Sequence, residues 1–175
     1  MRAALLCAIL AACGGRAPAP AAREAPPPRS KIPELDYFVG AWTIQARNPA
    51  TGQRFTMRYL IEPALGGAWL SGHGTSRELG VEVRDYWGRD PAGGGLVRII
   101  LQSDGTAGTV RSSGWQGEVL VLEGEVKSGG AVVQVRETIT RRGPARFDAV
   151  WEQKGPTGWS AYSVEQITRQ QGPRL

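Results

Sequence analysis

His73 is the only histidine in this chain of 175 residues, and therefore the only side chain whose ordinary pKa lies close to neutral pH. It lies between two glycines in Ser71-Gly72-His73-Gly74. A zinc ion needs three or four protein ligands, and the sequence offers no second histidine and no cysteine beyond residue 13 to join this one. We therefore expect His73 to be a structural or surface residue, and we assign no metal site.

Glu137 and Glu165 are the acids whose orientation the sequence leaves open, because apolar residues lie near each of them along its strand. If such a carboxyl group lies on the inner face of a sheet, burial raises its pKa and makes it a usable acid or base. Arg98 and Arg136 have similar surroundings. Buried charges need partners, so an inward arginine with an inward glutamate is the expected polar feature of any pocket, with structural pairing the leading interpretation. The nucleophile motif Gly-x-Ser-x-Gly is absent from the sequence, and we assign no catalytic residue.

Aromatic side chains recur from Tyr37 to Tyr162 and are able either to wall a ligand cavity or to fill a core. Filling is the commoner use of aromatic residues in a small protein interior, which is normally close-packed. The candidate ligand-binding residues are Trp42, Tyr59, Trp69, His73, Tyr86, Arg98, Trp115, Arg136 and Trp151.

Ten stretches with strand character must position these side chains. They cover residues 41–47, 54–62, 67–73, 80–88, 95–102, 107–114, 118–127, 131–141, 145–154 and 158–168. The alternation has a period of two, so Phe55, Met57, Tyr59 and Ile61 share one face of the second stretch. Turn residues such as Asp104-Gly105 separate the stretches, which favours consecutive antiparallel hairpins. Only the segment Ile32–Phe38 suggests a short helix.

Closure into a barrel is the expected arrangement of these strands, because an open sheet would expose two unpaired edges. The sequence thus predicts an all-β fold: a single antiparallel up-and-down lipocalin-like β-barrel of about ten strands, with a short N-terminal helix. The content of 24 glycines and 12 prolines agrees with many turns and argues against a helical bundle. A barrel of this size either holds one small ligand or fills itself with side chains.

Phe38-Val39-Gly40-Ala41-Trp42 opens the first strand and resembles the Gly-x-Trp entrance of the lipocalin and calycin barrels, in which the tryptophan plugs one end. Later motifs at residues 65–70, 85–90, 104–105 and 114–117, with the closing strand from Trp159, follow in a similar order. Together they resemble an uncharacterised bacterial lipocalin-like family, catalogued as a domain of unknown function. The resemblance covers about residues 34–168 and implies a fold without an established activity.

A haem-binding relative of this barrel, the nitrobindin type, uses a histidine near the carboxyl terminus. The last expected strand of this chain instead has Tyr162, Ser163 and Glu165. We therefore expect no haem and no other cofactor.

Residues 1–12 begin with a positively charged segment that is followed by an apolar stretch, a pattern typical of an export signal. The apolar stretch is too short to span a bilayer. Leu10-Ala11-Ala12-Cys13-Gly14 resembles a bacterial lipobox, which implies cleavage before Cys13 and lipidation of its sulfur. An ordinary secretory signal cut after Ala12, or a buried apolar helix, is the alternative. Cys7 would leave with the signal, so the mature chain would have neither a free thiol nor a disulfide.

Residues 13–30 are rich in proline and alanine and are expected to form a semi-extended tether, with the barrel at residues 31–175. Gly14 is not the aspartate that a resemblance to enterobacterial lipoproteins associates with inner-membrane retention. The expected location is the bacterial cell envelope, lipid-anchored through Cys13 to the outer membrane and facing the periplasm.

The net charge of +5 does not indicate a nucleic-acid partner. Residues 31–175 carry 17 basic and 15 acidic side chains, and the basic ones are scattered singly apart from Arg141 and Arg142. A phosphate-binding surface needs basic groups gathered on one face. We expect no nucleic-acid binding and predict no oligomeric state.

These observations favour non-catalytic binding, of a small apolar or amphipathic molecule in the barrel or of an envelope partner on its surface. The alternatives are an enzyme of unknown class using an inward Glu or His, and a purely structural envelope component. A binding protein needs a cavity with few polar groups, and an enzyme needs in addition a titratable group with a perturbed pKa. A structural protein needs neither.

Overall fold

Eleven strands and two short 3-10 helices make up residues 30–170, the part of the chain that the computed structural model describes. The strands are β1 (Gly40–Arg47), β2 (Arg54–Ala64), β3 (Trp69–Ser76), β4 (Val81–Arg89), β5 (Leu96–Gln102), β6 (Ala107–Ser112), β7 (Trp115–Gln116), β8 (Val119–Ser128), β9 (Ala131–Arg141), β10 (Arg146–Gly155) and β11 (Gly158–Arg169), and the helices are η1 (Pro33–Phe38) and η2 (Leu65–Gly67). The predicted signal at residues 1–12, Cys13 and the tether up to residue 29 lie outside the described residues.

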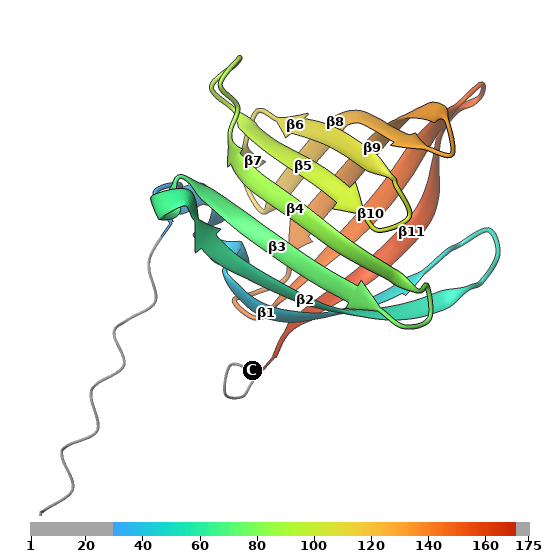
Figure 1. The fold of residues 1–175 in the computed structure, drawn as a ribbon, viewed down its shortest axis with the longest axis horizontal. Coiled ribbons are helices and arrows are strands. Elements are labelled where there is room, and N and C mark those ends of the chain that lie inside the picture. Colours follow the sequence, from blue (N-terminus) through green and yellow to red (C-terminus); the bar gives the residue numbers. More distant parts are fainter. Residues whose placement is uncertain (1–29, 171–175) are drawn as a thin grey trace, which may run out of the picture.

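The strands form one closed antiparallel barrel (Figure 1). Each strand pairs with its neighbour in the order β6-β5-β4-β3-β2-β1-β11-β10-β9-β8-β7, and an additional pairing of β6 with β8 closes the ring. The two-residue strand β7 pairs with β8 beside that closure. The predicted fold class, a single antiparallel up-and-down barrel of about ten strands, is confirmed.

All ten predicted stretches are strands, with ends shifted by a few residues, and the short strand β7 is the one addition. The segment in which a short helix was expected, Ile32–Phe38, forms the 3-10 helix η1, with Pro33 as its first residue. Ser30, which the sequence placed in the tether, is buried, and its hydroxyl accepts a hydrogen bond from the Ile32 amide at 2.8 Å. Within residues 30–170, no helix has both the length and the apolar character needed to cross a membrane.

Side chains alternate between the barrel interior and its outer surface, as a pleated strand requires. On β2 the residues Met57, Tyr59 and Ile61 are buried while their neighbours in sequence are exposed. The same alternation buries Leu120 and Leu122 on β8. Every strand thus contributes one inward row, and these rows together form the core.

Helix η1 covers one end of the barrel. Phe38 on η1 stacks on the Trp87 ring with centroids 5.1 Å apart, and the Trp42 indole N–H donates to the Phe38 carbonyl oxygen at 2.7 Å. Arg169, the last residue of β11, donates to the Val39 carbonyl oxygen at 2.6 Å and lies over the Trp42 ring. Trp42 therefore plugs this end, which we call the closed end.

The opposite end, which we call the open end, is formed by five hairpins. Consecutive antiparallel strands reverse direction at alternate ends, so the connections β1–β2, β3–β4, β5–β6, β8–β9 and β10–β11 lie together away from η1. Their residues are mostly exposed. The fold thus leaves one end covered by aromatic packing and the other bounded only by turns.

Candidate functional site

The barrel encloses a cavity of about 590 Å³. Exposed residues of the open-end hairpins, among them Gln53, Asp104 and Gln153, contribute to its lining, so the cavity reaches the surface there. The deeper lining is largely apolar and aromatic, with Met57 and Ile100 among its members. Its volume lies inside the range of about 300–1,000 Å³ that is typical of small-molecule sites.

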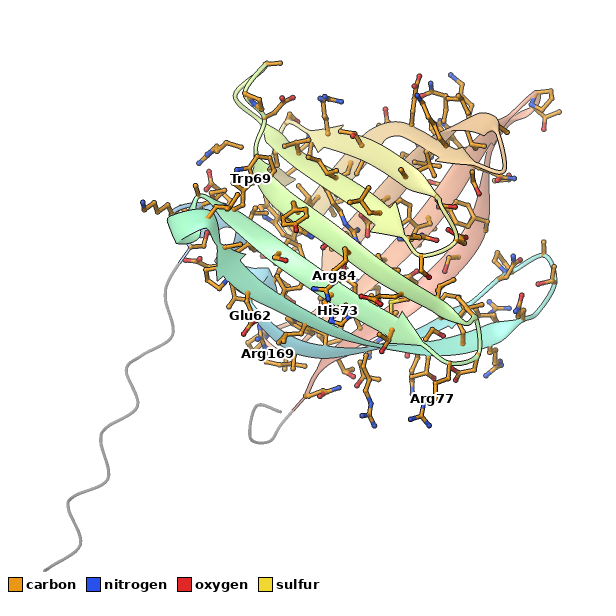
Figure 2. The ribbon with its side chains drawn as sticks, viewed as in Figure 1. Glu62, Trp69, His73, Arg77, Arg84 and Arg169 are labelled. Carbon is orange, nitrogen blue, oxygen red and sulfur yellow. The ribbon has the colours of Figure 1, made fainter. Side chains whose placement is uncertain are left out.

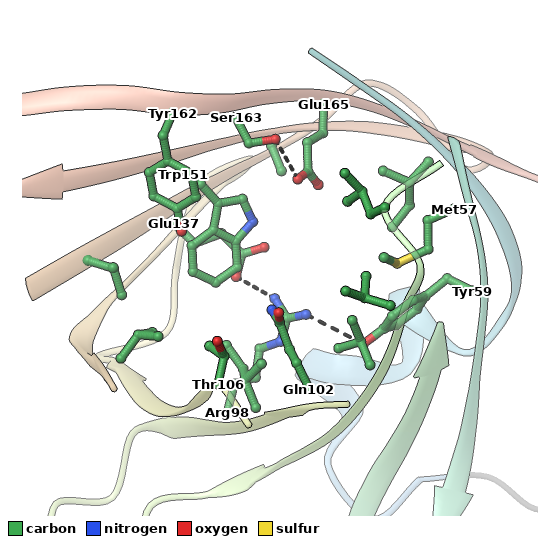
Figure 3. Close-up of a pocket in the computed structure, with 18 of the residues that line it drawn as sticks. Met57, Tyr59, Arg98, Gln102, Thr106, Glu137, Trp151, Tyr162, Ser163 and Glu165 are labelled. Carbon is green, nitrogen blue, oxygen red and sulfur yellow. Dashed lines mark hydrogen bonds and ion pairs between the residues drawn. The ribbon is translucent and has the colours of Figure 1, made fainter. Parts of the chain in front are cut away.

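Arg98 on β5 is the centre of a polar cluster inside this cavity (Figure 3). Its Nε donates to Asp85 Oδ2 at 2.6 Å, and its Nη1 donates to Glu137 Oε2 at 2.6 Å. Its Nη2 lies 3.5 Å from the Tyr59 hydroxyl oxygen. The guanidinium plane also lies near the Trp87 ring, with Cζ 4.3 Å from the centroid. Side chains from three other strands, β2, β4 and β9, thus hold this arginine in place.

Two glycines on the inner face of β3 make room for this cluster. A Cβ atom at Gly72 would overlap Asp85 Oδ1 and would lie 2.8 Å from the Tyr59 hydroxyl oxygen. A Cβ atom at Gly74 would overlap the Tyr59 ring and lie 2.7 Å from Met57 Sδ. Tyr59 can therefore lie flat against β3, with its hydroxyl beside the carboxylate of Asp85.

Burial and charge act in opposite directions on the ion pairs of the cluster. Burial disfavours the charged form of Arg98, but the carboxylates of Glu137 and Asp85 outweigh this and raise the pKa of Arg98 further. Burial raises the pKa of Glu137 above its ordinary value, and Arg98 offsets only part of that increase. Burial also raises the pKa of Tyr59, with the Asp85 carboxylate as the second cause. Tyr59 is therefore an uncharged hydroxyl at neutral pH.

Glu165 on β11 is a further carboxyl group that lines the cavity. The Ser163 hydroxyl donates to Glu165 Oε1 at 3.0 Å. Burial, and secondly the charge of Glu137, raise the pKa of Glu165 to about 7, although Ser163 and Arg98 both act to lower it. Glu165 is thus able to gain or lose a proton near neutral pH while it faces the cavity.

A β-bulge in β11 directs one further side chain inward. Trp151 on β10 is paired with Ser163, but the next residue, Glu152, is paired with Ala161, so the register skips Tyr162. Bulges re-aim side chains in this way. Consecutive residues Tyr162 and Ser163 therefore both line the cavity (Figure 3). Burial raises the pKa of Tyr162 well above its usual range, which keeps its hydroxyl uncharged.

Four of the nine candidate ligand-binding residues line the cavity, namely Trp42, Tyr59, Arg98 and Trp151. The expected pairing of an inward arginine with an inward glutamate is present as Arg98 and Glu137. Trp42 belongs to the aromatic packing of the closed end, whereas Tyr59 and Trp151 border the polar cluster. The aromatic residues therefore serve both as filling and as cavity wall.

The other five candidates, Trp69, His73, Tyr86, Trp115 and Arg136, are not among the residues that line the cavity. Trp69 packs on Gly88 of the neighbouring strand, and Tyr86 is exposed. Figure 2 shows His73 on the outer surface beside Arg84. Its Nε2 lies 3.1 Å from Glu82 Oε1. His73 therefore lies on the surface and outside the cavity lining (Figure 2).

Trp115 and Arg136 also lie outside the cavity lining, each for a physical reason. The Trp115 indole N–H donates to the Glu34 carbonyl oxygen at 2.9 Å, and its ring stacks on Phe38, so it belongs to the closed-end packing. Arg136 precedes the inward Glu137 and must point outward by strand alternation. There its Nε donates to Glu152 Oε2 at 2.8 Å.

Sequence reasoning missed Asp85 and Tyr162 as members of the site. The signal for Asp85 is present in the alternation of Val83, Asp85 and Trp87, which places a carboxylate in an inward row. Nothing in the sequence marks the bulge that turns Tyr162 inward. Within residues 30–170, no group of three or more His, Cys, Asp and Glu side chains is arranged to hold a metal ion.

Comparisons with known proteins do not assign this chain to a family. No family model and no curated protein matches it. Among solved structures, a redesigned β-barrel aligns with 81% of this chain and 99% of its own, at 15% sequence identity and a TM-score of 0.39. A likeness at that level carries no conclusion about function, and the resemblance to a bacterial lipocalin-like family stays a prediction.

Proposed function

We propose that this protein binds a small amphipathic molecule inside its barrel, without catalysis. The observation that carries the proposal is the cavity of about 590 Å³ with a polar cluster inside it and an opening between the hairpins. Ligand sites are commonly concave and mainly apolar, with a few convergent polar groups that fix orientation. Arg98, Glu137, Glu165 and Tyr162 are such groups here.

The amphipathic character follows from the distribution of polar atoms. Aliphatic and aromatic side chains such as Met57, Ile100 and Val135 cover most of the wall and would contact a hydrocarbon portion. A wholly apolar molecule would leave the carboxyl groups of the cluster without water and without a new partner, which is costly. A ligand with one polar end satisfies both kinds of surface.

The structural alternative is disfavoured by the cavity itself, since a purely structural barrel has no need of one. The enzymatic alternative with an inward histidine has no residue in its favour, because His73, the one histidine of the chain, lies on the outer surface (Figure 2). The alternative with an inward glutamate has one observation in its favour: Glu165 faces the cavity with a pKa of about 7, which suits a general acid or base. If the protein is an enzyme, a bound molecule should be recovered chemically altered. If the protein only binds, the molecule should be recovered unaltered.

Lipid anchoring at the cell envelope is the cellular part of the proposal. It is supported by the lipobox-like Leu10–Gly14 and by the proline-rich segment that follows. The described chain begins at Ser30, just before η1 at the closed end, so an anchor upstream of it would leave the open end uncovered. Ligand exchange with the surrounding compartment would then be unobstructed.

Titration of the full-length protein with N-phenyl-1-naphthylamine tests the binding proposal. This uncharged aromatic probe gains fluorescence when it leaves water for an apolar site. We expect a saturable increase with one site per chain, abolished by competition with a long-chain alcohol. Absence of any saturable increase would overturn the proposal.

A further inference from the structure

We propose that the polar end of the ligand is a cationic nitrogen, an ammonium group, that binds beside Glu165 within the cluster. This inference rests on the proposed binding function and names the class of ligand. The charges, hydrogen bonds and aromatic rings of the cavity support it independently of one another.

The first support is the imbalance of charge inside the barrel. Glu137 and Glu165 line the inner cavity, and Asp85 is fully buried behind it against Arg98. Asp104 lines the rim, and Arg98 is the one cation among the cavity-lining residues within the described part of the chain. Arg98 is bonded to two of these carboxyl groups already. A ligand cation would compensate a further negative charge, whereas a ligand carboxylate would add a fourth acid to the same interior.

The second support is that the Arg98 fork is engaged. Its Nε, Nη1 and Nη2 atoms are directed at Asp85, Glu137 and the Tyr59 hydroxyl, and its faces lie near Trp87 and Trp151. Recognition of a ligand carboxylate by arginine uses two parallel N–H donors. Arg98 would have to leave buried partners to supply them, which makes an anionic ligand costly.

The third support is the acceptor capacity of the two glutamates. An ionised carboxylate accepts about four hydrogen bonds. Arg98 uses Oε2 of Glu137, and Ser163 uses Oε1 of Glu165, so most of this capacity is still available. Figure 3 shows both carboxyl groups directed into the same space. An ammonium group carries only donors and is matched to such a site.

The fourth support is the aromatic wall next to the acids. Trp151 and Tyr162 lie with ring centroids 6.4 Å apart and both line the cavity. Faces of tryptophan and tyrosine attract cations, and more strongly in a desolvated site. The bulge that turns Tyr162 inward therefore brings a ring to the part of the cavity where Glu165 lies.

Protonation of Glu165 gives the site a pH dependence. The groups that face it are Glu137 on β9, Arg98 on β5 and Tyr162 on its own strand, together with the Ser163 hydroxyl. Its pKa of about 7 means that the carboxylate form, which an ammonium ion requires, is in the minority below neutral pH. Affinity for an amine is therefore expected to rise from pH 5.5 to pH 8.5, a range in which an alkylamine stays protonated.

The test compares three probes with the same chain and different head groups. n-Octylammonium, n-octanol and octanoate are each used to displace N-phenyl-1-naphthylamine from the full-length protein at pH 8. We expect octylammonium to bind about tenfold more tightly than octanol, as a charge-assisted hydrogen bond provides, and octanoate to bind least. The octylammonium affinity should fall by about tenfold or more at pH 5.5, while the octanol affinity stays constant.

The variant Glu165→Gln tests whether the preference for octylammonium arises inside the cavity. Its matched control is Glu62→Gln, on the outer face of β2. Glu165→Gln should remove the preference for octylammonium over octanol and its pH dependence, and a cooperative thermal unfolding transition shows that the variant is folded. Glu62→Gln should change nothing. The comparison of the three probes on the unmodified protein tests the proposal without any variant.

Equal affinity for octylammonium and octanol on the unmodified protein, or tighter binding of octanoate, would overturn the inference and leave the binding function standing. A preference for octylammonium that survives Glu165→Gln would overturn the assignment to Glu165. Failure of all three probes and of N-phenyl-1-naphthylamine to bind would instead overturn the proposed function.

Discussion

The guanidinium group of Arg98 on β5 bonds the carboxylate of Glu137 on β9 across the barrel interior, with Nη1 and Oε2 2.6 Å apart. Strands β6 and β8 separate these two strands in the wall, so the bond spans the lumen instead of following the sheet. Both residues are at least nine-tenths buried. An ion pair across the interior in this way holds the polar groups at one level along the barrel axis.

Replacement of Arg98 by methionine is expected to destabilise the protein by about 3–5 kcal/mol, because it leaves the buried Asp85 and Glu137 without their cation. Combining Arg98→Met with Asp85→Asn and Glu137→Gln removes the stranded charges and should recover more than half of that loss. Urea denaturation followed by tryptophan fluorescence measures both. If the single and the triple variant are equally stable, unpaired buried carboxylates are not the cause of the loss of stability.

Gly72→Ala should also destabilise the barrel strongly, by about 2 kcal/mol or more, because the new Cβ atom would overlap the Asp85 carboxylate. Gly93→Ala is the matched control, since the nearest atom to its new Cβ is a side-chain oxygen 3.8 Å away. That change is expected to alter the free energy of unfolding by less than about 0.5 kcal/mol. Thermal unfolding of the two variants compares them, and similar melting temperatures would contradict the packing of Tyr59 and Asp85 over β3.

Glu165 should make the stability of the protein depend on pH. The folded state keeps the proton up to about pH 7. The unfolded chain releases it near pH 4.3, so between these values the folded state binds more protons and stability falls as pH rises. The stability gained by Glu165→Gln should therefore increase by about 2 kcal/mol from pH 5 to pH 8. A gain that is the same at both pH values would show that Glu165 has an ordinary pKa.

Cys13→Ser tests the proposed anchor. If acylation of the Cys13 sulfur attaches the protein to a membrane, the wild-type chain produced in a bacterium should sediment with the membrane fraction, and the variant should not. Cell fractionation with immunoblotting distinguishes the two outcomes. Equal sedimentation of both chains would contradict lipid anchoring through this residue.

The sequence predicted the fold in detail because the strand signal is local. The alternation within residues 54–62 and turn residues such as Asp104-Gly105 each involve only a few neighbouring positions. Closure of the sheet into a barrel is then expected, because an open sheet would expose two unpaired edge strands. The same alternation predicts that Asp85 points inward between Val83 and Trp87. The same alternation requires Glu137 and Arg136 to point to opposite faces of the sheet, so the direction of one side chain determines that of the other.

The site was only partly predictable because it depends on contacts between distant strands. The pairing of Arg98 with Glu137 joins residues 39 positions apart, and no local pattern specifies it. The bulge at Tyr162 reverses the expected direction of one side chain. His73 is conspicuous in the sequence by its residue type, whereas the residues of Ser71–Gly74 that shape the barrel interior are the two glycines beside it, which leave room for Tyr59.

The most direct measurement of the central claim, that a ligand binds inside the barrel, is the affinity for N-phenyl-1-naphthylamine in two neighbouring variants. Val133 lines the cavity, whereas Val132 on the same strand is 57% exposed and points outward. We predict that Val133→Trp, which places an indole ring in the cavity, lowers the affinity at least about tenfold, and that Val132→Trp leaves it unchanged. Equal affinities in the two variants, or a loss confined to Val132→Trp, would contradict the account and move the binding site to the outer surface.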